Sequence, residues 1–261
     1  MAIDYNRIAP GYDQYRRQGI DLGHPQMAEK LAGRQRILEI GGGTGNLTLG
    51  LARLGVRPGL LAVLEPAGAM IRQARVKGAA GWWVQGAAPL LPFADKSFDA
   101  VISAYVMHHV PELETLFAET ARVLAPGGVT IHITVPHGYI REHPLNRFFP
   151  RFGAIDLERF PDETRLRQSL KTAGFSEISL EEASESPVPI DRAYLKRVEN
   201  RFLSTFALMT ETEFTAGVAA LRDAVEYGKG DTGLRQTRRI TLVFGRKPDR
   251  TAGRPGIQHE T

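Results

Sequence analysis

The chain has 261 residues, 43% of them hydrophobic and 24% charged, which is an ordinary globular composition with enough apolar material for a sizeable core. It contains no cysteine, which excludes a disulfide framework, a thiolate metal site and a cysteine nucleophile, and favours a reducing cytoplasm. Arginines scattered along the chain give a formal net charge of +4, whereas a nucleic-acid surface would concentrate them in a stripe with interleaved aromatic residues. Because no apolar run approaches the ~18 residues of a membrane span, we expect a soluble, cytoplasmic protein.

Residues 36–135 alternate apolar strand-like runs with amphipathic helical stretches, the pattern of a parallel sheet covered by helices. The strands are predicted at residues 36–40, 60–65, 81–85, 98–104 and 129–135. The helices between them are predicted at residues 45–54, 67–76 and 111–124.

The regularity changes after residue 135. Residues 136–161, rich in Pro, Phe and Arg, are interpreted as an irregular excursion; its RFFPRF stretch is the one local pattern typical of nucleic-acid binding. The remaining elements are predicted as a helix at 162–173, a strand at 176–183, a helical stretch at 191–227 and a final strand at 240–245. The polar tail after Lys247 is predicted to be disordered.

The first predicted strand leads directly into a glycine-rich turn, EIGGGTGN at residues 39–46. Glycines there permit a tight turn and let the backbone approach a ligand. A dinucleotide fingerprint needs a glycine at the sixth position from Gly41, where Asn46 stands, and no Gly-Lys-Ser/Thr follows as in a P-loop. Glu39, two positions before the first glycine, suits a cationic ligand amine better than a phosphate.

Glu65 closes the second predicted strand, about twenty residues after the glycine-rich turn. A carboxylate at that spacing can accept hydrogen bonds from both hydroxyls of a ribose. It also stands at the carboxyl end of a strand, where ligands bind in open α/β sheets.

Four stretches between residues 30 and 135 follow one another in a recognisable order: LEIGGGTGNLT, LAVLEPAGAMIRQAR, GAAPLLPFADKSFDAVISAYVMHHV and FAETARVLAPGGV. As a set they resemble the class I S-adenosylmethionine-dependent methyltransferases of the type 11 group, similar to the ubiquinone/menaquinone and malonyl-carrier enzymes. The resemblance implies an α/β, Rossmann-like, mostly parallel sheet of seven strands with an antiparallel last strand and helical lid insertions.

The resemblance further implies an enzyme that uses S-adenosyl-L-methionine and releases S-adenosyl-L-homocysteine. The enzyme would methylate a small molecule by in-line displacement, with O- or C-methylation favoured. We expect one continuous domain. Residues 1–135 would form an N-terminal cap and the cofactor-binding core, residues 136–250 the rest of the core with substrate lid insertions, and 251–261 a disordered tail. The oligomeric state is left open.

The resemblance also assigns residues to the cofactor. Gly41, Gly43 and Gly45 would line its methionine and ribose, Glu39 would face its amino group, and Glu65 would hold the ribose.

On the other side of the cofactor, Pro66 and Met70 would flank the adenine, because a flat, weakly polar ring requires an apolar sandwich. Ser103 and Ala104 would offer backbone carbonyls near the sulfonium. Tyr12, in a segment from Tyr5 to Tyr15 similar to the part that closes over the cofactor, would cover the mouth.

One stretch departs from the group's pattern. Where related sequences read Gly-Asp-Ala, with the Asp receiving the adenine amino group, this chain reads Gly86-Ala87-Ala88. The backbone amides of Ala87 and Ala88 can still meet the ring edge, so the resemblance implies weaker adenine binding and not another cofactor.

The acceptor side is less defined by the sequence. His108 and His109, just past the fourth predicted strand, are candidate general bases for an acceptor that must lose a proton. His132 is predicted to be buried, and no histidine metal site is predicted. The candidate substrate contacts are Tyr105, His137, His143 and Tyr194.

Three alternatives stay open. A nucleic-acid or protein methyltransferase of the same fold is disfavoured because the fourth strand ends in Ser103-Ala104-Tyr105-Val106, not in the Asp/Asn-Pro-Pro-Tyr/Phe of base-amine methylating enzymes. A non-catalytic S-adenosylmethionine-binding regulator is the second. An NAD-dependent oxidoreductase, disfavoured by Asn46, is the third.

Overall fold

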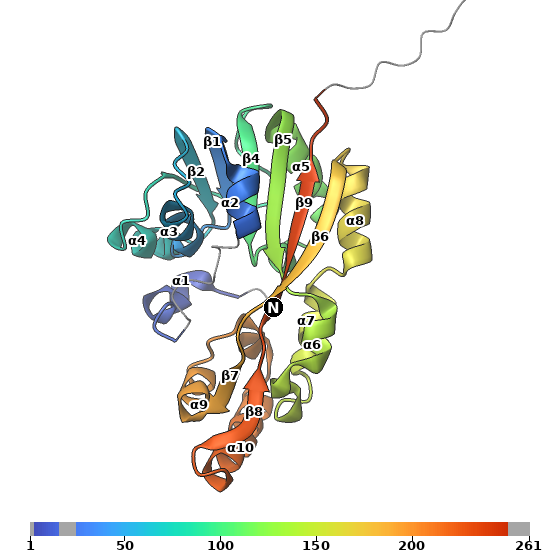
Figure 1. Ribbon diagram of the computed structural model, residues 1–261. Coiled ribbons are helices and arrows are strands. Elements are labelled where there is room, and N and C mark those ends of the chain that lie inside the picture. Colours follow the sequence, from blue (N-terminus) through green and yellow to red (C-terminus); the bar gives the residue numbers. More distant parts are fainter. Residues whose placement is uncertain (1–2, 16–24, 250–261) are drawn as a thin grey trace, which may run out of the picture.

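The computed structural model describes residues 3–15 and 25–249, so the predicted tail at 251–261 lies outside the described residues. Its centre is a seven-stranded sheet in the order β3-β2-β1-β4-β5-β9-β6 (Figure 1). The first five are parallel, and β9 is antiparallel to both of its neighbours, β5 and β6. The strands are β1 (Arg36–Ile40), β2 (Leu60–Glu65), β3 (Trp82–Gln85), β4 (Phe98–Ala104), β5 (Leu124–Thr134), β6 (Ser176–Ser184) and β9 (Arg239–Arg246). The predicted sheet with an antiparallel last strand is confirmed.

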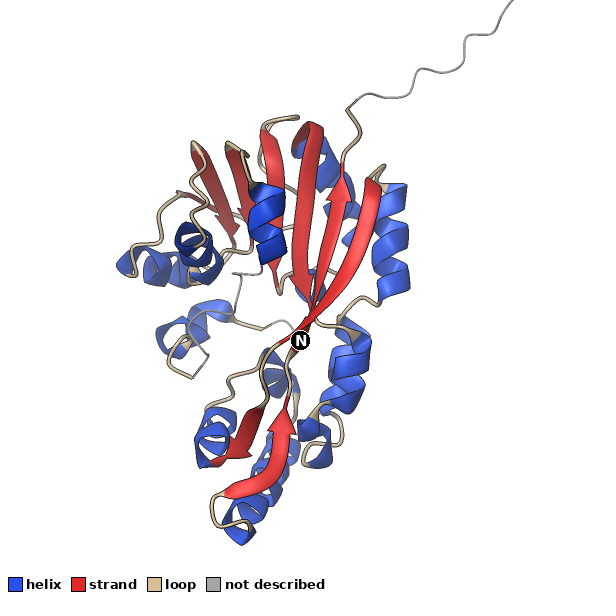
Figure 2. Ribbon diagram, viewed as in Figure 1, coloured by secondary structure: helices blue, strands red, loops and turns tan. Residues whose placement is uncertain are grey.

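Helices cover both faces of this sheet (Figure 2). The flanking helices are α2 (Pro25–Leu31), α3 (Asn46–Arg53), α4 (Gly68–Val76), α5 (Leu113–Val123) and α8 (Glu163–Thr172). Successive residues of β1 point to opposite faces of the sheet. Ile37 packs in one core with α2 and α3, and Leu38 packs in the other with α5 and α8. Both faces of a parallel sheet are buried in this way, which explains the continuous apolar runs in the sequence.

A second group of elements lies beyond the carboxyl ends of the parallel strands (Figure 1), and we call it the cap. It consists of α6 (His137–Glu142), α7 (Phe152–Arg159), β7 (Val188–Asp191), α9 (Arg192–Glu199), α10 (Glu211–Tyr227), β8 (Asp231–Gln236) and short 3-10 helices at Pro144–Arg147 and Ser204–Leu208. These elements share an apolar core of their own around Phe149, Phe152 and Phe206. β7 and β8 form a separate two-stranded antiparallel sheet.

The cap differs from the prediction in three respects. Residues 136–161 are not irregular but contain α6 and α7, the stretch predicted as helical at 191–227 is interrupted between α9 and α10, and β8 was not predicted. Phe149 and Phe152 of the RFFPRF stretch are buried in the cap core, so they cannot stack on nucleic-acid bases.

The N-terminal residues 3–15 lie against helix α4, which flanks the sheet. Helix α1 (Tyr5–Ile8) and a 3-10 helix at Ala9–Gly11 pack on α4. Among the described residues no helix is long and apolar enough to cross a membrane.

Candidate functional site

A cavity of about 1090 Å³ opens between the carboxyl ends of β1, β2 and β4 and the cap. One half of its wall is the glycine-rich turn with Glu39 and Glu65, and the other half comes from α6, α7 and the cap segments at 202–210 and 236–238. Ligands bind at this edge of open α/β sheets because the strand-to-helix turns diverge there.

The glycine-rich turn is held against β2 by backbone hydrogen bonds. The amides of Gly41 and Gly42 donate to the Leu64 carbonyl at 2.7 and 3.2 Å. Gly41 adopts a φ of +70°, and a Cβ added there would lie 2.3 Å from Cγ2 of Val106, so only glycine fits. Gly43, with a φ of +52°, faces open space and lines the cavity.

The carboxyl group of Glu39 is buried, with 1% of the residue exposed, and lines the cavity beneath this turn. The hydroxyl of Thr48 donates to it at 2.7 Å. Burial, reinforced by the nearby charge of Glu65 and opposed by the Thr48 hydrogen bond, raises the pKa of Glu39 to about 8. A buried acid of this kind is stabilised in its charged form by a cation bound beside it.

Glu65 bridges two backbone amides at the end of β2. One carboxylate oxygen accepts from Gly43 at 2.8 Å and the other from Ala67 at 2.9 Å. Burial raises its pKa despite these hydrogen bonds. Because each carboxylate oxygen can accept two hydrogen bonds, both retain a lone pair for a ligand hydroxyl.

The N-terminal segment contacts the glycine-rich turn through Asp13, which the sequence reasoning did not single out. Its carboxylate accepts from the Thr44 hydroxyl at 2.9 Å, the Asn46 amide at 3.0 Å and the Lys77 ammonium at 2.7 Å. Lys77 also donates to the Asn46 side chain at 2.7 Å, which closes the network. Tyr12, one residue earlier, lines the cavity as expected.

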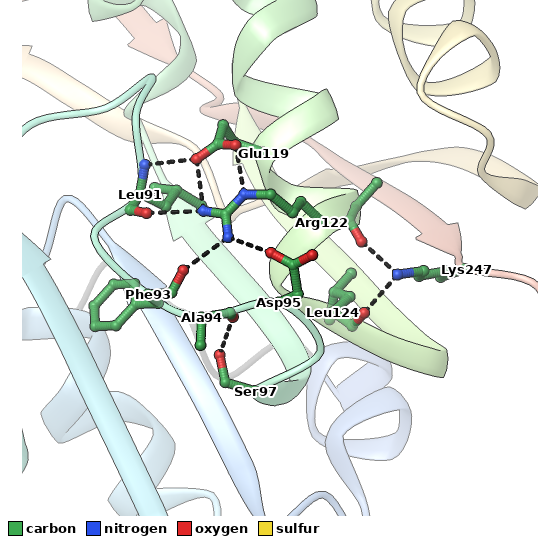
Figure 3. A network of polar contacts seen from close by, with 10 residues as sticks. Leu91, Phe93, Ala94, Asp95, Ser97, Glu119, Arg122, Leu124 and Lys247 are labelled. Carbon is green, nitrogen blue, oxygen red and sulfur yellow. Dashed lines mark hydrogen bonds and ion pairs between the residues drawn. The ribbon is translucent and has the colours of Figure 1, made fainter.

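The loop after β3 carries Ala87 and Ala88 in the cavity wall, which also contains Pro66 and Met70. Downstream, this loop is anchored by Arg122 at the end of α5, which donates to the carbonyls of Leu91 and Phe93 at 2.9 and 2.8 Å (Figure 3).

The same guanidinium pairs with Glu119 at 2.6 Å and Asp95 at 2.8 Å, and Glu119 accepts the Leu91 amide at 3.0 Å (Figure 3). This arrangement fixes both backbone groups of Leu91, and so ties the cofactor-side loop to α5.

The end of β4 enters the cavity at Ala104 and Tyr105. Tyr105 has a φ of +57°, in the region that favours glycine, and its amide donates to the Ile133 carbonyl at 2.9 Å. Beyond it, His109 Nε2 lies 2.8 Å from the Tyr5 hydroxyl, and the His108 ring stacks on Phe160 with centroids 4.0 Å apart.

The cap half of the cavity combines an apolar wall with a polar corner. There the side-chain amide nitrogen of Gln236 lies 2.5 Å from the Tyr139 hydroxyl and 2.9 Å from His143 Nε2. Arg238 is ion-paired with Glu185, and both line the cavity. The sequence showed Arg238 only as part of a short run of basic residues.

Among the described residues, four that were expected at the site do not line the cavity: Gly45, Ser103, His137 and Tyr194. Gly45 has a φ of +79°, and an added Cβ would lie 2.5 Å from that of Ala79, so it serves the packing of α3. Ser103 instead hydrogen-bonds buried His132 at 2.7 Å.

The other expected residues share the wall of this cavity. They are Tyr12, Glu39, Gly41, Gly43, Glu65, Pro66, Met70, Ala87, Ala88, Ala104, Tyr105, His108, His109 and His143. His137 is close to it but its Nε2 lies 2.8 Å from the Phe160 carbonyl. Within residues 3–15 and 25–249, no group of three or more His, Asp or Glu side chains could hold a metal ion.

Residues 38–132 match the methyltransferase domain family Methyltransf_11. The chain is 29% identical over 171 residues to the ubiquinone/menaquinone biosynthesis C-methyltransferase UbiE of Sinorhizobium fredii, an alignment that covers 55% of this chain and 66% of that protein. It is 32% identical to the biotin biosynthesis bifunctional protein BioHC of Cellvibrio japonicus, over 64% of this chain and 32% of that protein.

Among solved structures, the fold is similar to a putative methyltransferase from an antibiotic biosynthesis pathway of Anabaena variabilis, with a TM-score of 0.63 and 22% identity. That alignment covers 85% of this chain and 96% of the other. The similarity of fold therefore extends beyond the residues 38–132 that match the family.

Proposed function

We propose that this chain, a class I S-adenosylmethionine-dependent methyltransferase of the type 11 group, methylates a small molecule. The small molecule would be held between the glycine-rich turn and the cap. O- or C-methylation is the favoured reaction. The observation that carries this proposal is the pair of buried carboxyl groups, Glu39 and Glu65, on either side of the glycine-rich turn in one cavity.

The residues of the sheet half fit S-adenosylmethionine. Glu39 would take the amino group, since a buried carboxyl with a raised pKa gains most from a cation. Glu65 would take the ribose hydroxyls with the lone pairs that Gly43 and Ala67 leave available. Gly41 and Gly43 would lie along the methionine and ribose.

The adenine would lie between Pro66 and Met70, with the backbone of Ala87 and Ala88 at its edge. Tyr12 would cover it, and Ala104 would line the sulfonium side. Gly45 and Ser103 support this half from behind the wall, through the packing of α3 and the hydrogen bond to His132.

The bound cofactor supplies an activated methyl group on a positively charged sulfur. The chain's part is to hold the acceptor atom in line with the carbon–sulfur bond and to exclude water. The cap and residues 3–15 enclose the cavity for that purpose. The cofactor held by these residues would supply the methyl group, and the electron pair of its broken carbon–sulfur bond would stay on S-adenosylhomocysteine.

For an acceptor that must lose a proton, the base would be His109 or His108. Both follow β4 directly, at the cavity wall between the cofactor half and the cap. His137 and Tyr194 remain candidate substrate contacts that would require a movement of the cap.

The test is calorimetric binding of S-adenosylhomocysteine, followed by transfer from labelled S-adenosylmethionine to small-molecule extracts. Glu65→Ala should weaken cofactor binding by about 1.5 to 3 kcal/mol, as for a lost charged hydrogen bond. Glu29→Ala, which removes an exposed carboxylate on α2 away from the cavity, is the matched control and should bind normally. Unchanged affinity in a folded Glu65→Ala protein, or no binding by the wild type, would contradict the proposal.

A further inference from the structure

Two polar atoms, one at the end of β4 and one in the cap half of the cavity, are buried without a hydrogen-bond partner among the described residues: the Tyr105 hydroxyl and Nε of Arg238. Both residues line the cavity. Buried polar groups are nearly always hydrogen-bonded in folded proteins, and an unmet buried donor is destabilising. Two such atoms in one cavity wall therefore indicate a ligand that supplies what they lack.

The chemistry of the two atoms restricts that ligand. Nε of arginine can only donate, so its missing partner is an acceptor atom, and a tyrosine hydroxyl can donate to the same kind of atom. The two side chains act on each other: burial raises the pKa of Tyr105, and the positive charge of Arg238 opposes that rise. Arg238 is held in place by its ion pair with Glu185, so Nε is presented in a fixed direction.

The backbone conformation of Tyr105 is a second indication that this residue has a function. It is not glycine, yet its φ is +57°. Non-glycine residues in this region are strained, and such residues gather at ligand sites, where the surroundings hold them. Tyr105 lines the cavity and also packs, partly buried, against the apolar core that α2 and α3 share with the sheet.

Besides its charged and polar side chains, the cap half of the cavity has an apolar wall. Its wall contains Ile140, Phe152, Ile155, Phe160, Phe202 and Leu208. An acceptor that fills this space must carry an apolar, ring-sized or branched body, with its polar group at one end.

We propose that Tyr105 and Arg238 together bind an acidic oxygen, a carboxylate or a phenolate, on an otherwise apolar methyl acceptor and orient that acceptor at the end of β4. This inference rests on the proposed function, because it places the acceptor beside the cofactor half of the same cavity. Tyr105 and Arg238 are specificity-determining residues in this arrangement, and their removal weakens acceptor binding without removing the cofactor.

The test uses the full chain loaded with S-adenosylhomocysteine and four probes: 4-butylbenzoate with its neutral counterpart 4-butylbenzamide, and 4-butyl-2-nitrophenol with 4-butyl-2-nitroanisole. The nitro group lowers the phenol's pKa from its ordinary value of about 10 far enough to make it a phenolate at pH 8. Dissociation constants are measured by calorimetry at pH 8. At least one acidic probe should bind about tenfold or more tightly than its neutral counterpart, as expected for a charge-assisted hydrogen bond. The two pairs distinguish a carboxylate from a phenolate site.

Variants then assign the preference to residues. Tyr105→Phe should reduce it about threefold to tenfold, and Arg238→Lys, which keeps a positive charge for Glu185 but lacks Nε, should reduce it at least as much. Tyr227→Phe is the matched control, because Tyr227 on α10 is exposed and does not line the cavity. It should leave the preference unchanged.

The inference is overturned if neither acidic probe is preferred over its neutral counterpart, if neither binds, or if Tyr227→Phe has the same effect as Tyr105→Phe. Binding of S-adenosylhomocysteine is measured first in each protein. Its absence from the wild type would contradict the proposed function, whereas normal binding without a preference for acids would contradict this inference alone.

Discussion

Glu39 is the residue whose ionisation should respond most to the cofactor. Its pKa of about 8 in the free protein means that the carboxyl is largely protonated at neutral pH. A bound ammonium lowers that pKa, so binding expels a proton. We therefore expect the affinity for S-adenosylmethionine to rise with pH up to about pH 8 and to fall above it, because the ligand's α-amino group, with an ordinary pKa of about 7.7 to 8.0, then loses its charge. Calorimetry in two buffers of different ionisation enthalpy measures the released proton directly.

Glu39→Gln is the control for that prediction, because an amide can still accept from Thr48 but cannot titrate. Its binding should be weaker and should lack the rise with pH. The folded pKa of Glu39 lies above its ordinary value of 4.5, so the wild type loses stability as pH rises from about 4.5 to about 8. The cofactor-free variant should accordingly unfold at a higher temperature than the wild type at pH 8. An unchanged proton release in Glu39→Gln would assign it to another group.

At the scale of elements, residues 3–15 connect the sheet to the cap. Asp13 binds the glycine-rich turn and Lys77, and Arg197 of α9 donates to the Tyr15 carbonyl at 2.9 Å. Burial acts to raise the pKa of Asp13, but the hydrogen bonds from Lys77, Asn46 and Thr44 outweigh it and hold the pKa below its ordinary value. The contact is therefore complete at neutral pH and is lost only when the pH falls through that lowered pKa.

Asp13→Asn should increase the dissociation rate of the cofactor several-fold, about 1 kcal/mol for a partly exposed charged network. Stopped-flow displacement of S-adenosylhomocysteine measures this rate. Lys77→Gln alone should have a smaller effect of the same sign, and the double variant should fall short of the sum, because the two side chains act through one contact. Strictly additive effects would show that Asp13 and Lys77 act independently.

The elements that the sequence predicted well are those whose pattern is local. In α5, Leu113, Leu116, Phe117 and Val123 recur at helical spacing and all are buried, so the period alone identifies the helix. By contrast, β8 reads Asp-Thr-Gly-Leu-Arg-Gln, without an apolar alternation, and it pairs with a strand that lies about forty residues earlier and contains Pro189. Such pairing depends on contacts across the cap, which no window of sequence displays.

The candidate site divides in the same way. Glu39, the glycine-rich turn and Glu65 belong to one strand-turn-helix-strand unit, so their spacing predicts their proximity. Arg238 reaches the cavity only because Ser184, at the end of β6, pairs with Arg239, at the start of β9. After the cap, the chain therefore re-enters the sheet beside the residue at which it left. The part of the cavity formed by Glu39, the glycine-rich turn and Glu65 is thus predictable from sequence, whereas the part that contains Arg238 requires the assembled molecule.

For the whole molecule, this topology predicts that the cap can be removed without destroying the sheet. Residues 185–238 connect Ser184 to Arg239, and these two residues pair directly in the sheet. An Asn-Gly turn can therefore replace residues 185–238 and close the β6–β9 hairpin. Residues 137–160 pack in the same cap core and must be removed with them, since Phe149 and Phe152 would otherwise be exposed. An eight-residue Gly-Ser linker, which reaches about 26 Å when extended, can join β5 to α8.

The shortened protein should retain a cooperative unfolding transition and bind S-adenosylhomocysteine within about tenfold of the full chain, about 1.4 kcal/mol, because the proposed cofactor contacts lie on the sheet half. It should have no preference for acidic over neutral probes, because Arg238 and the apolar wall are gone. Circular dichroism and calorimetry measure both properties. A folded product that no longer binds the cofactor would show instead that the cap supplies essential cofactor contacts, since the sheet-side residues proposed to hold the cofactor would all still be present.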